Sequence, residues 1–493
     1  MSISRLPVTP SNIPELRALR GNVKVWEPHC RSILSSPTFS KLSSELKEFN
    51  CVAPPIGGDN PVFLVNGLIF KFFSPCVTNS GTLQFRGKES FEAELLFYTQ
   101  LQAQAQAEVS NAVPICVGHG TLEELYDEPN ATVSWPFVIT SKIEGHSLMT
   151  MRRTPTTAFD SDSSATQESI ARQLGAMTGA INSITVPSSH RERFLSLWLR
   201  QTAKRLMTLR ARAQQLLTDK EPAVSAAVEV SSDSKTKEAK RPPWVLKWLP
   251  VHLSAKLCEY LPGDVGALLD ALQQLYGLPG KSSTPKAAQS DVFDWSDYAS
   301  HPVLSAASPA IAFLHGDLHE EHVFVDYAQP KSSRKRPRPD EETAGDSEHK
   351  DATVPPTLQI RGVIDFGDCC VAPRLYELVQ IHANVLQLDR RLLSMFIQAY
   401  GVDQMGLSSA GKEHIALFVK CCMWLTLLSE YDVIQGVRLL DREKSLKLPD
   451  SGTALQGSAA DPNPLKWKRL RDSVDWTSFA TLSELAHYMW APA

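Results

Sequence analysis

Residues 314–326 read LHGDLHEEHVFVD, and residues 360–368 read IRGVIDFGD. In both stretches a short apolar run ends on, or opens from, acidic residues, among them Asp317 and Asp365. This pattern is typical of buried strands that present carboxylates at their ends. The two stretches therefore predict strand ends that carry chemistry, and we interpret the rest of the chain around them.

The polar residues of these stretches resemble the motifs of the aminoglycoside phosphotransferase family and its choline-kinase-like relatives. That family carries H-G-D-x-x-x-x-N and then I-D-(W/F), and this chain has HGDLHEEH at 315–322 and IDF at 364–366. The resemblance extends over residues 51–435. It implies an α+β, two-lobed fold of the protein-kinase-like type, with a small antiparallel-sheet N-lobe and a mostly helical C-lobe.

Phosphoryl transfer requires a protein to position an acceptor hydroxyl and to hold metal ions on the phosphates. By the resemblance, Asp317 orients the hydroxyl as a general base, and His322 and Asp365 bind Mg²⁺. The implied function is an ATP- and Mg²⁺-dependent phosphotransferase that acts on a hydroxyl of a small molecule. We expect no protein acceptor, since no long activation segment ending in A-P-E follows Asp365.

The third motif residue departs from the family, which usually has Asn where this chain has His322. Mg²⁺ prefers oxygen ligands, whereas imidazole suits softer metals. Macrolide phosphotransferases are similar to this chain in carrying H-G-D-x-x-x-x-H-V. The substitution is therefore compatible with activity, and it leaves the identity of the metal open.

Upstream, Lys71 is the one charge inside the apolar run 68–73, LIFKFF. It is either an edge-strand lysine or, as we prefer, the strand lysine that contacts nucleotide phosphates in kinases. Such a lysine needs a carboxylate on a following helix. The segment 91–101, FEAELLFYTQL, supplies Glu94 as the predicted partner, with Glu92 as the alternative register.

Two further segments are expected to contact the nucleotide. Gly57 and Gly58 form a turn whose backbone N–H groups can approach phosphates closely, although such pairs are more often plain hairpin turns. Residues 135–148, WPFVITSKIEGHSL, are similar to the hinge strand and interlobe linker of the family. Backbone groups from Thr140 to Lys142 would then hydrogen-bond adenine.

Two other classes of function start from the same residues. A nucleotide-binding pseudokinase or scaffold would explain the unusual His322, and it would bind nucleotide without turnover. A non-haem iron oxygenase would use His315 and Asp317 with a distant histidine, such as His382 or His414. The neighbouring His319 is either a third metal ligand or, as we prefer, a hydrogen-bonded loop residue.

The bulk composition narrows the remaining possibilities. With a net charge of −4, the 493-residue chain gives no case for nucleic-acid binding. Nine cysteines without a C-x-x-C pattern favour reduced thiols, and hence a cytoplasmic or nuclear protein. The longest apolar run, 415–428, is interrupted by Lys420 and is too short to span a membrane, so it predicts a buried helix.

Low-complexity segments divide the chain. The run KSSRKRPR at 331–338 is either a nuclear localisation signal or a solvated loop. The N-terminal extension and the insertions leave room for a protein partner. We predict a helical extension over 1–50, an N-lobe with hinge over 51–148, and a C-lobe over 149–493 with disordered insertions at 218–243, 328–356 and 447–463.

Overall fold

The computed structural model describes residues 6–7, 9–39, 41–42, 49–53, 60–75, 77–79, 82–84, 86–104, 109, 111–128, 133–153, 164–218, 249, 251–280, 294–327, 358–408, 411–429 and 478–493. The Gly57-Gly58 turn and the basic run 331–338 lie outside these ranges. So do the predicted insertions, apart from residue 218, which ends a helix.

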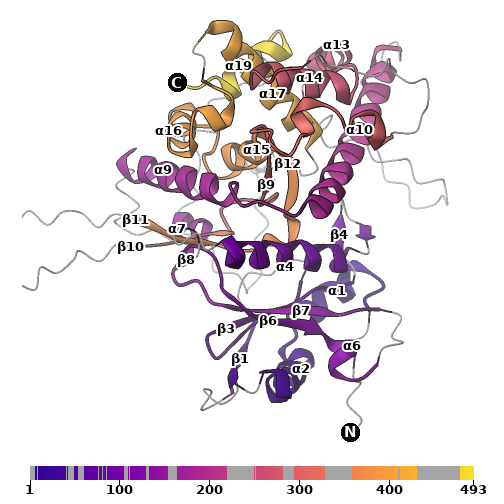
Figure 1. Ribbon diagram of the computed structural model, residues 1–493, viewed down its shortest axis with the longest axis vertical. Helices are drawn as coiled ribbons and strands as arrows, with labels where there is room; N and C mark the ends of the chain where they lie inside the picture. The colour runs from indigo at the N-terminus through magenta and orange to yellow at the C-terminus, as the bar shows by residue number, and fades with distance from the viewer. Residues whose placement is uncertain are drawn as a thin grey trace, which may run out of the picture.

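A five-stranded antiparallel sheet forms one lobe, drawn at the bottom of Figure 1. The hairpin at its centre turns at Asn66 and Gly67, which both have positive φ, as the twist of a two-residue hairpin requires. Its β-branched and aromatic residues suit a half-buried pleated surface. The order is β1 (Cys51–Val52), β2 (Val62–Val65), β3 (Leu68–Phe72), β7 (Pro136–Ser141) and β6 (Cys116–Thr121).

The N-terminal segment packs on this sheet. Helix α1 (Ile13–Arg20) begins after Asn12, whose side chain accepts a hydrogen bond from the Glu15 N–H. Helix α2 (Val23–Ser35) has a proline inside it and was not expected as a separate helix. Its Trp26 ring is fully buried and lies 4.4 Å from the ring of Phe72.

Helix α4 (Gly87–Gln104) crosses between the two lobes (Figure 1). It is longer at both ends than the predicted segment 91–101. Its first residue must be glycine, because a Cβ on Gly87 would lie 1.9 Å from the Ser74 carbonyl oxygen. Before it, β4 (Val77–Asn79) pairs with β5 (Thr82–Gln84). Helix α6 (Leu122–Leu125) follows β6.

The second lobe is mostly helical and packs around two small antiparallel sheets (Figure 1). One sheet pairs β9 (Ile311–Leu314) with β12 (Cys370–Pro373), and the other orders β11 (Leu358–Val363), β10 (Val323–Tyr327) and β8 (His146–Ser147). The helices are α7 (Leu148–Arg153), α9 (Ser164–Ile181), α10 (Ser188–Thr218), α12 (Val251–Ser254), α13 (Leu257–Tyr260), α14 (Val265–Leu275), α15 (Arg374–Asn384), α16 (Arg390–Tyr400), α17 (Lys412–Leu428) and α19 (Leu482–Trp490).

Five short 3₁₀ turns connect the described elements: Pro37–Phe39, Trp295–Asp297, Pro302–Leu304, Phe366–Asp368 and Asp403–Met405. The apolar run 415–428 lies in α17, whose residues 418–428 are almost all buried, as predicted. Among the described residues, no helix combines the length and the apolar character needed to cross a bilayer. The predicted α+β architecture, with a small antiparallel-sheet lobe and a mostly helical lobe, is confirmed.

The packing of α2 can be tested by truncating its central aromatic residue. We expect Trp26→Ala to lower the free energy of unfolding by about 3–5 kcal/mol, because a large buried ring leaves a cavity. Denaturant unfolding followed by circular dichroism measures the loss. Met207→Ala is the control, since that side chain is 52% exposed, and it should change stability by no more than about 0.5 kcal/mol. Equal losses would contradict the described packing.

Candidate functional site

The two acidic stretches meet because β9 and β12 pair. Leu314 lies opposite Cys370, so the loop after β9 runs beside the turn that precedes β12. Gly316, at φ +86°, makes this approach possible, because a Cβ there would lie 2.1 Å from the Asp368 carbonyl oxygen. Asp365 has a left-handed backbone, with φ 69° and ψ 67°. This conformation is uncommon outside glycine and points to a local functional constraint.

Lys71 joins the two lobes at this point. Its Nζ lies 2.6 Å from Oε2 of Glu94 on α4 and 2.5 Å from Oδ1 of Asp365. The Tyr98 hydroxyl, one helical turn beyond Glu94, donates to the other Glu94 oxygen at 3.1 Å. The predicted Glu94 register therefore matches the structure. Glu92 instead contacts Arg193 of α10 at 2.6 Å, on the other side of the helix.

The charges of this cluster stabilise one another. Burial alone would lower the pKa of Lys71, but the carboxylates of Asp365 and Glu94 raise it well above its usual value. Burial alone would raise the pKa of Asp365, but Lys71 and His322 hold it well below its usual range. The Asp365 side chain nevertheless keeps 38% of its surface accessible. A charged carboxylate is thus held partly accessible at the contact between the lobes.

His322 lies across Asp365 from Lys71. Its Nδ1–H donates to the backbone carbonyl of Asp317 at 2.8 Å, which leaves Nε2 facing Oδ2 of Asp365 at 3.3 Å. Burial alone would lower the pKa of His322, but Asp365 and Asp317 raise it to about 9. The ring is therefore charged when it faces these carboxylates alone.

His319 completes a compact group with Asp317 and His322. The three side chains offer ligand atoms that all lie within 4.8 Å of one another. Nε2 of His319 is 3.8 Å from Oδ2 of Asp317, and Nδ1 accepts from the Glu321 N–H at 3.3 Å. Burial and the neighbouring His322 lower the pKa of His319 to about 3. His319 accepts a hydrogen bond within its loop, as preferred from the sequence, and it also lies in a group of possible metal ligands, which was the alternative.

The pKa of Asp317 is raised to about 7, first by burial and then by the nearby Asp368 and Asp365 carboxylates, against the pull of His322. A carboxylate with a pKa near neutrality can both accept and release a proton, as a general base requires. Its position at the tip of the loop after β9, beside the Lys71–Asp365 contact, is compatible with the predicted role.

The donor set fits a divalent cation. Metal-binding histidines usually donate their second ring N–H to a carbonyl or carboxylate, which fixes the tautomer. His322 does so through Nδ1, so its Nε2 becomes a ligand atom once the ring is neutral. Asp365 supplies an accessible carboxylate beside it. A mixed nitrogen and oxygen set of this kind suits Mn²⁺ at least as well as Mg²⁺.

The histidines required by the iron-oxygenase hypothesis are not gathered. His315 donates through Nε2 to the Ile364 carbonyl at 2.8 Å and accepts at Nδ1 from the Asp317 N–H at 3.4 Å, so both ring nitrogens face the backbone. His382 hydrogen-bonds to the Met489 carbonyl, and His414 to the Gly406 carbonyl. None of the three belongs to the group of possible metal ligands among the described residues.

The predicted hinge residues lie at the C-terminal end of β7, an interior strand of the sheet. Thr140 is buried in β7 and is paired with both neighbouring strands. Lys142 follows the strand, and its Nζ contacts Glu144 at 2.7 Å. The chain leaves the sheet after Ser141 and turns at Gly145, where a Cβ would lie 2.6 Å from the Val325 carbonyl. Backbone groups beyond Ser141 are therefore better placed than Thr140 to meet a ligand.

Two supporting contacts were missed in the sequence. Glu377 of α15 accepts a hydrogen bond from the His315 N–H at 2.9 Å and so holds the start of the loop after β9. Glu320 pairs with Arg152 of α7, and both side chains are nearly buried. In the sequence, Glu377 and Glu320 are charged residues near apolar ones, but only the tertiary structure shows that they contact the His315 N–H and Arg152.

Comparison with known proteins gives one sequence match and several structural ones. Residues 357–413 match the model of the Phosphotransferase enzyme family, a range that contains Asp365. The family resemblance expected from the motifs is confirmed over this range. A comparison with curated protein sequences found no match.

Among solved structures, the chain is similar to the amicoumacin kinase hAmiN in complex with AMP-PNP, Ca²⁺ and Ami, with 13% identity and a TM-score of 0.34, covering 88% of this chain and 91% of that one. An aminoglycoside-3'-phosphotransferase of type VIII is 15% identical, with a TM-score of 0.33, and the match covers 80% of this chain and 97% of that one. The phosphotransferase APH(3'')-Id from Streptomyces rimosus is 14% identical, with a TM-score of 0.32, and the match covers 80% of this chain and 96% of that one.

The buried ion pair can be tested with two neighbouring glutamates of one helix. We expect Glu94→Gln to cost about 3 kcal/mol of stability, since it removes the charge that pairs with a buried lysine. Glu92→Gln, which breaks only a half-exposed pair with Arg193, should cost less than about 1 kcal/mol. Denaturant unfolding of both variants measures the difference. The reverse order would assign the pairing role to Glu92.

Proposed function

We propose that this protein transfers the terminal phosphoryl group of ATP to a hydroxyl group of a small molecule. The observation that supports this most is the contact of Lys71 with Asp365 across the lobes, with Asp317 and His322 in the adjoining loop. A cation aimed at phosphates, an accessible metal-binding carboxylate and a carboxylate with a pKa near neutrality are the parts that phosphoryl transfer requires.

The roles follow from the positions of the side chains. Lys71, held by Glu94, would contact the nucleotide phosphates and offset their charge. Asp365 and the Nε2 atom of His322 would hold a divalent cation, which supplies charge neutralisation on the phosphates when bound. Backbone groups between Ser141 and Gly145 would meet the adenine. The Gly57-Gly58 turn, which lies outside the described residues, stays a prediction as a phosphate contact.

Asp317 would act on the acceptor. As the bond forms between the acceptor oxygen and the γ-phosphorus, the bond from that phosphorus to the bridging oxygen breaks and ADP leaves. The acceptor hydroxyl proton passes to the Asp317 carboxylate. Positioned general bases contribute about 10²–10⁴-fold to the rate, and most of the remaining acceleration comes from alignment and charge stabilisation.

A pseudokinase remains the second proposal, because one observation favours it. Asp365 is already paired with Lys71 at 2.5 Å and faces a protonated His322 at 3.3 Å. A carboxylate that two protein cations neutralise gains less from a bound metal ion. In that case the protein would bind nucleotide without turning it over.

Nucleotide binding and turnover separate these proposals. We expect ATP with Mg²⁺ or Mn²⁺, at about one hundred times its dissociation constant, to stabilise the wild type by roughly 2.7 kcal/mol. Asp317→Asn should keep this stabilisation but lose at least about 10²-fold of the slow ATP hydrolysis in which water replaces the acceptor. Asp365→Asn should lose the metal-dependent stabilisation itself.

Thermal unfolding and ADP release provide the two measurements. Stabilisation by ATP without hydrolysis in the wild type would favour the pseudokinase. No stabilisation by any nucleotide would overturn both proposals. His382→Asn, which alters a buried histidine bonded to the Met489 carbonyl, is the control for a histidine without a role in the site.

The unusual His322 predicts a metal preference. We expect His322→Asn, which restores an oxygen ligand, to lower the ratio of activity with Mn²⁺ to activity with Mg²⁺, because imidazole favours the softer ion. Initial rates with each metal in both proteins give the ratio. His382→Asn is the control, since that histidine is bonded to the Met489 carbonyl and lies outside the group of possible metal ligands among the described residues. A ratio unchanged in His322→Asn would contradict a metal-binding role for His322.

A further inference from the structure

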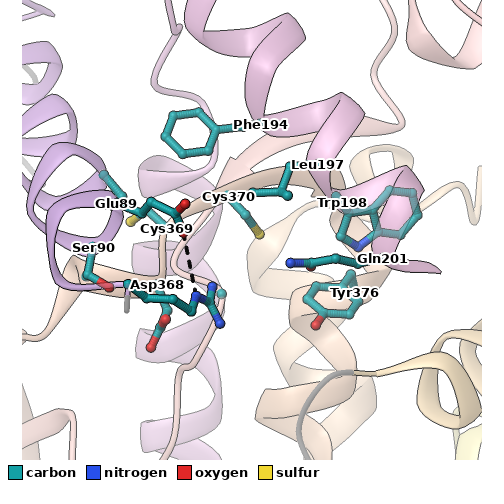
Figure 2. A pocket seen from close by; sticks show the side chains of 14 residues that line it. Glu89, Ser90, Phe194, Leu197, Trp198, Gln201, Asp368, Cys369, Cys370 and Tyr376 are labelled. Atoms are coloured by element: carbon teal, nitrogen blue, oxygen red, sulfur yellow. Dashed lines mark ion pairs between the residues drawn. The ribbon is translucent and has the colours of Figure 1, made fainter. Parts of the chain in front are cut away.

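A hollow lies between the two lobes, beside the loop that carries Asp317. Its walls come from the first turns of α4, from the N-terminal half of α10 and from the segment 367–370 before and in β12. Figure 2 shows side chains of α4 on one side of it and of α10 on the other, with Glu89 and Ser90 opposite Leu197. Elements from both lobes thus enclose one space at the site.

This hollow adjoins the reacting groups. Gly316, the residue before Asp317, lines it. Burial and the carboxylate of Asp368, another lining residue, both raise the pKa of Asp317, so the two carboxylates are within electrostatic reach of each other. A Cβ on Gly367 would lie 3.5 Å from Nζ of Lys71. Asp317 itself does not line the hollow, so a molecule there meets its carboxylate only with a group that extends past Gly316.

The walls favour a flat apolar body. Phe194, Trp198 and Tyr376 line the hollow, and the rings of the last two pack edge to face with centroids 6.1 Å apart. Leu197, at 37% exposure, is the most exposed apolar side chain among the lining residues. Removing apolar ligand surface from water against such walls is favourable, and pairs of aromatic rings gain further from their geometry.

The charges in the walls are too few for a polycation. The lining holds one basic side chain, Arg86, and two acidic ones, Glu89 and Asp368, a balance of −1. Arg86 and Glu89 lie 3.7 Å apart and offset each other. A charge that leaves water needs a partner of opposite sign, so the hollow can accommodate one ligand cation at most. The two acids disfavour an anionic ligand.

We propose that this hollow receives the body of the acceptor, and that the acceptor is an alcohol with a flat apolar body and at most one positive charge. Its hydroxyl lies on a short arm that extends past Gly316 to Asp317. Leu197 determines the specificity, because it offers the ligand the most apolar surface. The inference rests on the proposed phosphotransfer to a hydroxyl and names the class of acceptor.

The probe is 2-naphthaleneethanol, because it joins an uncharged flat body to a hydroxyl on a short arm. Two compounds are compared with it: inositol, which has hydroxyl groups but no apolar body, and kanamycin, which is a polycation. Titrations of the full chain without nucleotide, followed by the ligand NMR signals, give the dissociation constants. We expect the wild type to bind 2-naphthaleneethanol at least about tenfold more tightly than either of the others.

Two glutamate variants of α10 locate the binding. Leu197→Glu places a carboxylate at the hollow, so it should weaken the binding of 2-naphthaleneethanol about tenfold and strengthen that of kanamycin. Met207→Glu is the matched control, since that side chain is on the same helix, is 52% exposed and does not line the hollow. It should leave both affinities unchanged. A loss for one probe with a gain for the other cannot come from misfolding.

The inference is wrong if inositol or kanamycin binds the wild type as tightly as 2-naphthaleneethanol, or if the two glutamate variants behave alike. Phosphotransfer is scored separately, by ADP release from ATP and Mg²⁺ with each probe. ADP release stimulated by kanamycin and not by 2-naphthaleneethanol would overturn the acceptor class and leave phosphotransfer intact. Binding as expected, without ADP release to any probe or to water, would count against phosphotransfer and leave the ligand class of the hollow standing.

Discussion

Lys71 bound between two carboxylates from different parts of the chain is the interaction on which the site depends. Glu94 approaches from α4 and Asp365 from the turn before β12, so one ammonium group fixes the position of a helix against a turn of the other lobe. Removing Glu94 leaves the buried Lys71 with only the partly accessible Asp365 as a charged partner, which is more costly than losing a surface ion pair. Stacking of Phe97 on Phe366, with ring centroids 3.7 Å apart, reinforces the same junction.

The same contact influences the protonation of the carboxylates beside it. Lys71 and His322 hold Asp365 ionised, whereas burial keeps the pKa of Asp317 near neutrality. Two carboxylates of one site thus differ in protonation because their neighbours differ. Such a separation distinguishes a metal-binding carboxylate from a proton-accepting one. The orientation of His322 fits this arrangement. Its Nδ1–H donates to the Asp317 carbonyl, so its Nε2 atom faces Asp365.

Much of this arrangement could be predicted from sequence. The apolar runs before Asp317 and Asp365 predict their strands, and a lone lysine in an apolar strand predicts Lys71 as a functional residue. The register of α4 was harder, because Glu92 and Glu94 are both plausible until packing decides which one faces the sheet. Helix α2 was not resolved, since Pro28 breaks the local signal although tertiary packing of Trp26 stabilises the helix.

Contacts between distant segments were beyond prediction. The hydrogen bond from the His315 N–H to Glu377 depends on α15 lying beside the loop after β9, and the pair of Glu320 with Arg152 depends on α7 lying beside that loop. Neither leaves a periodic pattern in the chain. The need for glycine at position 316 was also beyond prediction. The motif contains a glycine, but only its close approach to the Asp368 carbonyl shows why a larger residue would not fit.

The central claim is that Asp365 and His322 hold a metal ion against the nucleotide phosphates. Pulsed electron paramagnetic resonance of Mn²⁺ bound with ATP tests it directly. The account predicts coupling of the ion to both the phosphorus of the nucleotide and the nitrogen of a histidine, with the nitrogen signal lost in His322→Asn and the phosphorus signal retained. Bound Mn²⁺ without phosphorus coupling, or with a nitrogen signal unaffected by that substitution, would contradict the account.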